Sequence, residues 1–294
     1  MCYNGFMEIS ILRFFENLRC VFATIFAFLF SLFGETLFLV VLICLIYWIW
    51  DKRLGEKLVI TSFSSMSLNA FLKTLIARPR PFTTGKVSRL DIDTPILSTT
   101  NLHPFESFPS GHSQMSAGMF FTGAFHFKKK WSWIVFPLLT VGVMLSRLYF
   151  GVHYPTDVLV GATLGIAFAC FWEFLFQKKE SWKYSILAGF SLLSVLFCII
   201  EPSKSSLELC GCLCATAIGL PIENKYLAFE NATTGKNRIY RAFIGLACVG
   251  AVFGLFSLLP FAFLELWGWK LVKYFLTVLT GVLLVPYLFK KLKI

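Results

Sequence analysis

Charged residues are scarce in this sequence. Only 15% of its 294 residues are Asp, Glu, Lys or Arg, whereas 57% are hydrophobic. An ordinary soluble domain carries about 25% charged residues, so this composition excludes an ordinary soluble protein. Histidine is rarer still, with four in the chain, and 16 acidic residues stand against 27 basic ones. The sequence contains no low-complexity tract and no stretch polar enough to form a separate soluble domain.

The nine cysteines do not indicate a metal site. Most lie in or beside apolar stretches, where a thiol behaves as a small hydrophobic side chain. Cys210, Cys212 and Cys214 alternate, but on a helix only the first and third share a face, and no histidine stands nearby. We therefore expect no metal and no cofactor. We identify no secretory signal, because no short apolar run near the start of the sequence is followed by a small-residue cleavage site.

Long apolar stretches dominate the rest of the chain. A helix needs about 20 mostly apolar residues to cross a hydrocarbon core of roughly 30 Å. The sequence therefore predicts an all-α, polytopic membrane bundle. We predict an interfacial or re-entrant helix at 20–33 and crossings near 36–50, 56–76, 111–127, 132–149, 155–176, 184–200, 206–222, 239–260 and 270–289.

Basic residues gather in alternate connections, which predicts the orientation of the protein. The net charge of +11 comes from loops between apolar segments rather than from one basic module, so we expect no nucleic-acid partner. The basic loops near residues 52–57, 128–130, 178–183 and 225–241 and the basic tail should be cytoplasmic. The opposite face then receives the connections 78–108, 150–155, 201–206 and 261–268.

The first cluster of chemically active residues ends the 56–76 segment. It runs from Lys73 to Arg80-Pro81, and its prolines stop the helix so that Arg80 can turn back toward Lys73. Lysine offers a point charge and arginine a planar fork, the two ways in which side chains bind phosphate oxygens. Taken alone, the pair is also compatible with interfacial basic residues that extend toward water.

The second cluster, Pro109-Ser110-Gly111-His112, opens the next segment. Ser110 is placed as an N-cap, and Gly111 allows a ligand to approach the backbone. The free N–H groups of a helix start favour an anion, and His112 could protonate a departing oxygen. A capped helix with an incidental histidine is the simpler alternative.

The third cluster spans a tight loop between two segments: Ser146-Arg147, then His153, then Asp157. Asp157 follows His153 by one helical turn, so its carboxylate could accept the imidazole N–H and orient the other nitrogen outward. A histidine held in this way can act as a nucleophile without a metal. An interfacial histidine beside a helix-capping aspartate is equally compatible with this cluster alone.

Taken together, the three clusters favour one phosphate site. Two of the four histidines, three cationic residues and a helix start all fall on the same predicted membrane face. Ionisable residues at membrane depth are costly and indicate function by default. Glu35 lies at a helix break that could face this site, but we interpret it as a neutral or partnered structural carboxyl.

The order and spacing resemble the type 2 phosphatidic acid phosphatase superfamily, whose motifs run K-x6-RP, PSGH and SR-x5-H-x3-D. All three are present without departure, and the resemblance covers about residues 36–176. It implies a helical core and a phosphohistidine on His153, which Asp157 orients, while His112 acts as general acid and later activates water. The residues that it implies for phosphate binding are Lys73, Arg80, Ser110, Gly111 and Arg147.

We therefore expect a membrane phosphatase that hydrolyses a lipid phosphate or diphosphate: polyprenyl diphosphate, phosphatidic acid, phosphatidylglycerophosphate or sphingoid-base phosphate. The site should open on the non-cytoplasmic face, with the C-terminus cytoplasmic. The loop 82–108 is our hypothesis for headgroup selection. Alternatives are a lipid phosphotransferase with the same site, a lipid transporter or scramblase, a sugar-phosphate phosphatase, and a haloperoxidase, which the membrane composition disfavours.

We predict three parts of the chain. An N-terminal interfacial or re-entrant segment covers 1–35, the catalytic membrane core covers 36–180, and C-terminal transmembrane helices of unknown role cover 181–294.

Overall fold

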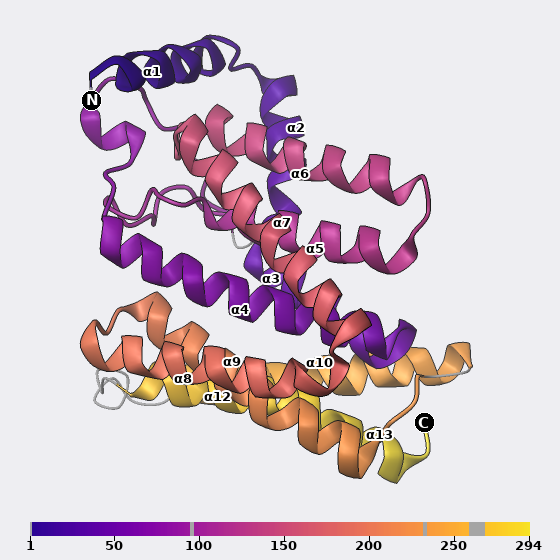
Figure 1. The fold of residues 1–294 in the computed structure, drawn as a ribbon. Coiled ribbons are helices and arrows are strands. Elements are labelled where there is room, and N and C mark those ends of the chain that lie inside the picture. The colour runs from indigo at the N-terminus through magenta and orange to yellow at the C-terminus, as the bar shows by residue number, and fades with distance from the viewer. Residues whose placement is uncertain (1, 95–96, 232–233, 259–267) are drawn as a thin grey trace. The chain divides into compact units, whose positions relative to one another are not determined.

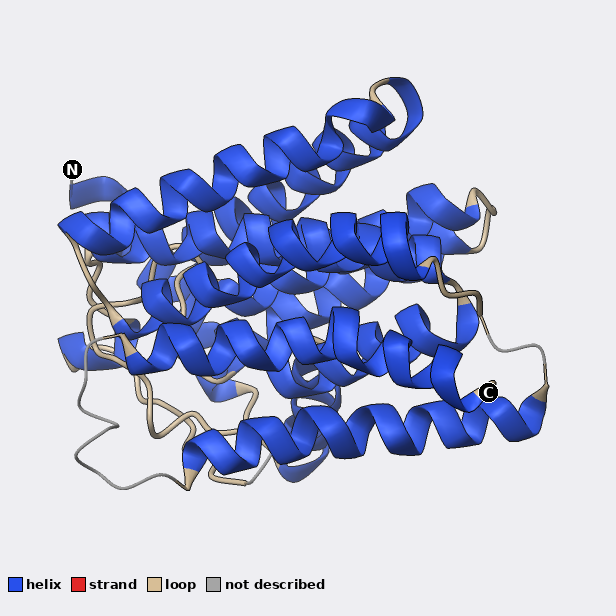
Figure 2. Ribbon diagram, turned by 90° about the horizontal axis from the view of Figure 1, so that it is seen from below, coloured by secondary structure: helices blue, strands red, loops and turns tan. Residues whose placement is uncertain are grey.

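The computed structural model describes residues 2–94, 97–231, 234–258 and 268–294. Within these ranges the chain consists of helices joined by loops, and the only strand-like pairing is an isolated bridge between Asp93 and Ser98 (Figure 2). The predicted all-α class is confirmed.

The chain forms two compact units. Unit 1 contains Met1–Val40 and Leu68–Phe171, and unit 2 contains Val41–Ser67 and Trp172–Ile294. The boundaries therefore fall inside helices rather than in linkers. The three parts predicted from the sequence, with divisions after residues 35 and 180, stay a prediction.

Unit 1 holds every residue of the predicted phosphate site. Its hairpin of α5 and α6 is visible in Figure 1, and α2 and α1 also pack against α6. The sequence analysis predicted no helix for α1. The helices that lie wholly in this unit are α1 (Cys2–Asn17), α2 (Val21–Leu32), the short η2 (Pro81–Thr84), α5 (Gly111–Phe127) and α6 (Ser132–Tyr149). Three helices are shared with unit 2: α3 (Thr36–Leu45), α4 (Lys52–Ile76) and α7 (Pro155–Lys178).

Two local features bring the motifs of unit 1 close to one another. Gly151 adopts a φ of 70° in the turn that joins α6 to α7, a conformation that costs glycine little. On α7, a Cβ at Gly161 would lie 2.5 Å from the carbonyl oxygen of Ser110. The absence of a side chain there lets α7 lie directly against the start of α5.

Unit 2 contains the C-terminal helices. Among them, α9 packs against both α8 and α12 (Figure 1). Ion pairs join its segments: Lys57 Nζ lies 2.5 Å from Glu173, with both side chains buried, and the partly exposed Lys52 Nζ lies 2.7 Å from the buried Glu223. The elements are η1 (Ile46–Trp50), η3 (Glu180–Trp182), α8 (Lys183–Ile200), α9 (Lys204–Ile222), η4 (Glu223–Leu227), α10 (Gly235–Ser257), α12 (Trp269–Leu279), η5 (Thr280–Leu284) and α13 (Val285–Leu292).

Among the described residues, seven helical stretches are long and apolar enough to cross a membrane. The bent pair Phe6–Asn17 and Val21–Leu32, which meets at 118°, makes an eighth if it is one span. The protein is therefore an integral membrane protein. Two predicted crossings are shorter: Thr36–Trp50 is an apolar helix below spanning length, and α5 has 17 residues. The segment predicted at 239–260 begins earlier, at Gly235, and ends at Ser257. The predicted turn at 261–268 lies almost wholly outside the described residues.

Candidate active site

The three motifs converge in unit 1 around the turn between α6 and α7. His153 lies in this turn, with its side chain 3% exposed. Arg147 ends α6, and Asp157 lies in the first turn of α7. Lys73 belongs to the last turn of α4, Arg80 follows that helix, and Ser110 caps α5.

The His153 ring is held by one nitrogen and presents the other. Its Nδ1 lies 2.8 Å from the carbonyl oxygen of Ser107, which can only accept a hydrogen bond. Nδ1 therefore carries the hydrogen and Nε2 the lone pair. Burial, followed by the positive charges of Arg80 and Lys73, holds the pKa of His153 well below its ordinary value of 6.5. The imidazole is neutral at pH 7, as a nucleophile requires.

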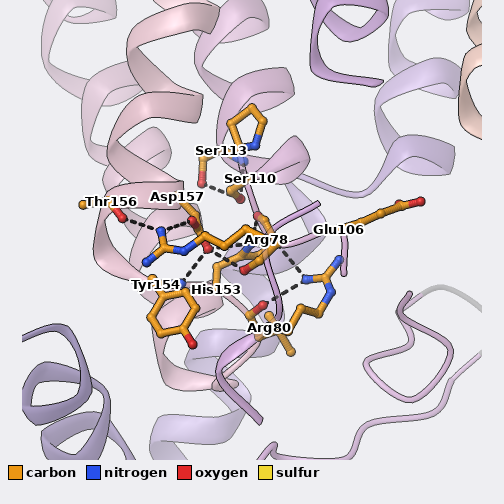
Figure 3. A network of polar contacts seen from close by, with 12 residues as sticks. Arg78, Arg80, Glu106, Ser110, Ser113, His153, Tyr154, Thr156 and Asp157 are labelled. Carbon is orange, nitrogen blue, oxygen red and sulfur yellow. Dashed lines mark hydrogen bonds and ion pairs between the residues drawn. The ribbon is translucent and has the colours of Figure 1, made fainter. Parts of the chain in front are cut away.

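Arg80 faces Nε2, the other nitrogen of this ring. Its Nη1 lies 3.2 Å from His153 Nε2 and 2.9 Å from the carbonyl oxygen of Val152, while its Nε donates to the carbonyl oxygen of His103 at 2.8 Å. Figure 3 shows the guanidinium directed at the histidine. A phosphorus atom attacked by Nε2 would thus have a guanidinium beside its oxygens.

The predicted contact between Asp157 and His153 needs a correction. Asp157 Oδ2 lies 3.6 Å from His153 Nδ1, too far for a hydrogen bond. The same oxygen instead accepts from the Ser107 hydroxyl at 2.5 Å and from the backbone N–H of Tyr154 at 2.8 Å. The reason is geometric, because the carboxylate caps the start of its own helix. Asp157 and the His153 ring are therefore linked through Ser107, whose hydroxyl contacts the carboxylate and whose carbonyl contacts the ring.

Arg78 and Glu8 are neighbours of the site that the sequence analysis missed. Arg78 Nη1 donates to Asp157 Oδ1 at 2.6 Å and to the Thr156 hydroxyl at 2.7 Å, as drawn in Figure 3. Its Nη2 lies 2.7 Å from Glu8 on α1. Arg78 lies between Lys73 and Arg80, where the motif reads as a spacer. The signal that could have led to Arg78 was Asp157, an aspartate for which the sequence analysis predicted no cationic partner.

The loop between α4 and α5 positions cations through its backbone. Lys73 Nζ donates to the carbonyl oxygen of Glu106 at 2.7 Å. The same loop also holds Arg80. Its side chain donates to the carbonyl oxygen of His103, and its backbone N–H donates to the carbonyl oxygen of Pro104 at 2.8 Å. Headgroup selection by this loop stays a prediction.

Arg147 is a buried cation with unused donors. Its side chain is 0% exposed, and Nη1 donates to the hydroxyl of Ser31 at 2.7 Å. Within the part of the chain that the structure describes, Nε and Nη2 have no hydrogen-bond partner. Buried donors are nearly always paired, and a lone group calls for a functional explanation. An anion would supply the missing acceptors.

The start of α5 is built as predicted, with one difference. Ser110 accepts from the N–H and the hydroxyl of Ser113, as an N-cap should. However, its own backbone N–H donates to the carbonyl oxygen of Asp157 at 3.0 Å and so is not free to bind an anion. The N–H groups of Gly111 and His112 lie in the first turn, where a helix supplies no acceptor. Nε2 of His112 lies 2.7 Å from Glu35.

Across the described ranges, no group of three or more His, Cys, Asp or Glu side chains could hold a metal ion. Cys210, Cys212 and Cys214 lie on α9, and the Sγ atoms of the first and third are 4.0 Å apart.

These features define a helical membrane protein with three cations around two oriented histidines. Residues 56–181 match the model of the PAP2 superfamily, and residues 207–294 match the model of the PAP2 superfamily phosphatase, transmembrane extension. The chain therefore belongs to the PAP2 superfamily, and the resemblance drawn from its three motifs is confirmed.

Three relatives show how far the similarity to curated proteins extends. The bacitracin transport permease protein BcrC of Bacillus licheniformis is 39% identical over 100 residues, which cover 34% of this chain and 46% of that protein. An undecaprenyl-diphosphatase of Sulfolobus acidocaldarius is 33% identical over 117 residues, covering 39% and 51%. Phosphatidylglycerophosphatase B of Bacillus subtilis is 32% identical over 126 residues, covering 40% and 54%. The chain thus spans about half the length of these relatives.

Proposed function

We propose that this protein hydrolyses a lipid phosphate or diphosphate through a phosphohistidine formed on His153. The observation that carries the proposal is the orientation of the ring: Nδ1 is tied to the Ser107 carbonyl, and Nε2 faces Arg80 at 3.2 Å. This geometry leaves a neutral nitrogen lone pair beside a guanidinium, which can turn to the phosphate oxygens when a phosphoryl group binds at Nε2.

In the first half-reaction, His153 Nε2 attacks phosphorus in line with the departing oxygen. Negative charge is spread over the three equatorial oxygens, and stabilising it is the main task of the protein. Lys73, Arg80 and Arg147 supply the cations, with the first-turn N–H of Gly111 as a further donor. Arg147 fits this role because its Nε and Nη2 have no acceptor among the described residues.

His112 serves both half-reactions in this proposal. As an imidazolium it protonates the departing lipid oxygen, and as the resulting neutral base it removes a proton from the water that attacks the phosphohistidine. The nucleophile is a side chain, so the scheme needs no metal-bound hydroxide. Asp157 is a positioning residue, because it holds Ser107, whose carbonyl orients His153.

Two observations support an amphiphilic substrate. The histidines lie at the ends of apolar helices of an integral membrane protein. Two relatives carry the names undecaprenyl-diphosphatase and phosphatidylglycerophosphatase B. We propose that the site opens on the non-cytoplasmic face and that the C-terminus is cytoplasmic, an orientation that the basic residues in alternate loops support. The substrate would then present its phosphate at headgroup depth.

The test is phosphate release by the purified protein in detergent, with EDTA present. The panel contains a polyprenyl diphosphate, phosphatidic acid, phosphatidylglycerophosphate and a sphingoid-base phosphate. His153→Ala should abolish release. The matched control is His126→Ala, at the far end of the helix that carries His112 and about 21 Å away along its axis.

Release that survives EDTA and is lost only in the His153 variant supports the proposal. Phosphate that appears on an added lipid acceptor instead of in solution would replace hydrolysis with phosphoryl transfer. A folded protein that releases phosphate from none of the four lipids would overturn the lipid phosphatase.

A further inference from the structure

The break between α2 and α3 brings a carboxylate to the second histidine of the site. Glu35 lies in this break, preceded by Gly34. A Cβ at Gly34 would lie 2.9 Å from Cγ1 of Val143 and 3.0 Å from Cβ of His112. Only a residue without a side chain allows the break to lie this close to α5. The close approach places Oε1 of Glu35 2.7 Å from His112 Nε2.

This contact fixes the chemistry of the His112 ring. An ionised carboxylate can only accept, so Nε2 carries the hydrogen of the bond. Nδ1 is then the nitrogen that can gain or lose a proton during a reaction. The side chain of His112 is 22% exposed, which leaves the ring accessible from outside the protein core.

The charges around His112 come from four places in unit 1. Burial, Arg147 on α6 and Lys73 on α4 hold the pKa of His112 below its ordinary value of 6.5. These cations, together with His153 in the turn between α6 and α7, oppose a positive charge on the ring. Glu35 is the anion that favours it. Burial raises the pKa of Glu35, but the hydrogen bond from His112 and the charges of His112 and Arg147 outweigh it, so this pKa lies below its ordinary value. Glu35 is thus ionised at neutral pH.

We infer that Glu35 is a positioning residue for His112, whose imidazolium form it stabilises and whose Nδ1 it directs to the departing oxygen. The inference rests on the proposed phosphatase function. As the bond between His153 Nε2 and phosphorus forms, the bond to the lipid oxygen breaks, and that oxygen takes the proton from His112 Nδ1. In the second step, water oxygen bonds to phosphorus, the P–N bond breaks, and His112 Nδ1 takes the proton of the water.

The inference is tested with two substrates, an alkyl phosphate and a nitrophenyl phosphate that carries the same hydrocarbon chain on its ring. The nitrophenolate departs without a proton, whereas the alkoxide needs one. Glu35→Gln should lower kcat/KM for the alkyl phosphate by about 10-fold or more, within the range that general acids contribute, and change the aryl phosphate by about two-fold or less. In the pH profile of Glu35→Gln with the alkyl phosphate, the limb on which activity falls with rising pH should lie at lower pH than in the wild type.

Two further variants complete the experiment. Glu35→Asp keeps the charge and should restore part of the activity and the position of the limb. Glu201→Gln removes an exposed carboxylate in unit 2 and should change neither. If Glu35→Gln fails to fold, the pH profile of Glu35→Asp decides. Its limb should lie close to that of the wild type, and His112→Gln, which lacks the titrating ring, should show no such limb.

Equal losses on both substrates with an unchanged pH profile would overturn the inference and leave Glu35 a structural role. Full activity of Glu35→Gln, with His153→Ala inactive, would also overturn it while leaving the phosphatase intact. Failure of the proposed function has a different signature: wild-type protein without phosphate release from either ester.

Discussion

His112 and His153 are held by opposite ring nitrogens. Nε2 of His112 lies 2.7 Å from Glu35, whereas Nδ1 of His153 lies 2.8 Å from the carbonyl oxygen of Ser107. The first acceptor is an anion, which favours a charged ring, and the second is neutral, which leaves a neutral ring beside three cations. Two chemically identical side chains are thus suited to the different tasks that we propose for them, one as acid and one as nucleophile.

This difference predicts that a covalent intermediate can be trapped. His112→Asn removes the base that activates water, but an aryl phosphate needs no acid in the first step. Incubated with a radiolabelled aryl phosphate, this variant should accumulate label on the protein. The label should survive alkali and be lost in acid, as a phosphorus–nitrogen bond requires, and peptide mapping should place it on His153. Label that persists in the double variant with His153→Ala would contradict this assignment.

Removing Arg78 should destabilise the protein more than it disturbs phosphate binding. Asp157 is 0% exposed and would keep an uncompensated charge in Arg78→Ala, which costs about 3 kcal/mol. Arg78→Lys keeps one charge but loses the fork that joins Asp157 to Glu8. We expect thermal unfolding in detergent to rank the wild type above Arg78→Lys and the latter above Arg78→Ala. Equal stability of all three would show that this ion pair contributes nothing.

The sequence predicted the motif residues and the helices other than α1, because both depend on local patterns. Apolar runs of spanning length, an N-cap serine and prolines after α4 are visible over a few residues. The partners that orient the motif residues were out of reach. Glu35 and His112 are 77 positions apart, and Glu8 and Arg78 are 70 apart. Such pairs are set by helix packing, which no spacing rule describes.

The error over Asp157 has the same origin. One helical turn does bring Asp157 close to His153, at 3.6 Å. What the spacing could not show is the competition for the carboxylate, since Ser107, Tyr154 and Arg78 all donate to it. Because Ser107 belongs to a loop without a periodic pattern, its carbonyl could not be assigned to the histidine from the sequence.

His153 predicts a dependence of stability on pH. Its pKa in the folded protein is well below 6.5, first because it is buried, whereas in the unfolded chain it takes up a proton near pH 6.5. Below that pH the unfolded state binds more protons, so the free energy of unfolding falls as pH falls, by at most about 1.4 kcal/mol per pH unit. Melting temperatures between about pH 7.5 and pH 5.5 should fall less for His153→Gln than for the wild type. Parallel curves would contradict the low pKa.

Arg147 predicts a conflict between stability and activity. Its guanidinium is buried, and within the described ranges Nε and Nη2 have no hydrogen-bond partner. Each buried unsatisfied group costs about 1–3 kcal/mol, which the empty site bears and a bound phosphate relieves. Arg147→Met fills a similar volume without the charge, so it should raise the melting temperature of the phosphate-free protein while lowering phosphatase activity by about 100-fold or more.

Inorganic phosphate separates this explanation from simple repacking. It should raise the melting temperature of the wild type, because a ligand that binds only the folded state stabilises it, and it should have little effect on Arg147→Met. The control is Arg241→Met in unit 2, where the guanidinium donates to the carbonyl oxygens of Trp48, Glu230 and Ile294. That substitution should lower stability, because those carbonyls lose their donor, and should leave the response to phosphate intact. A less stable Arg147→Met with an undiminished phosphate response would show that Arg147 supports the fold and does not bind the anion.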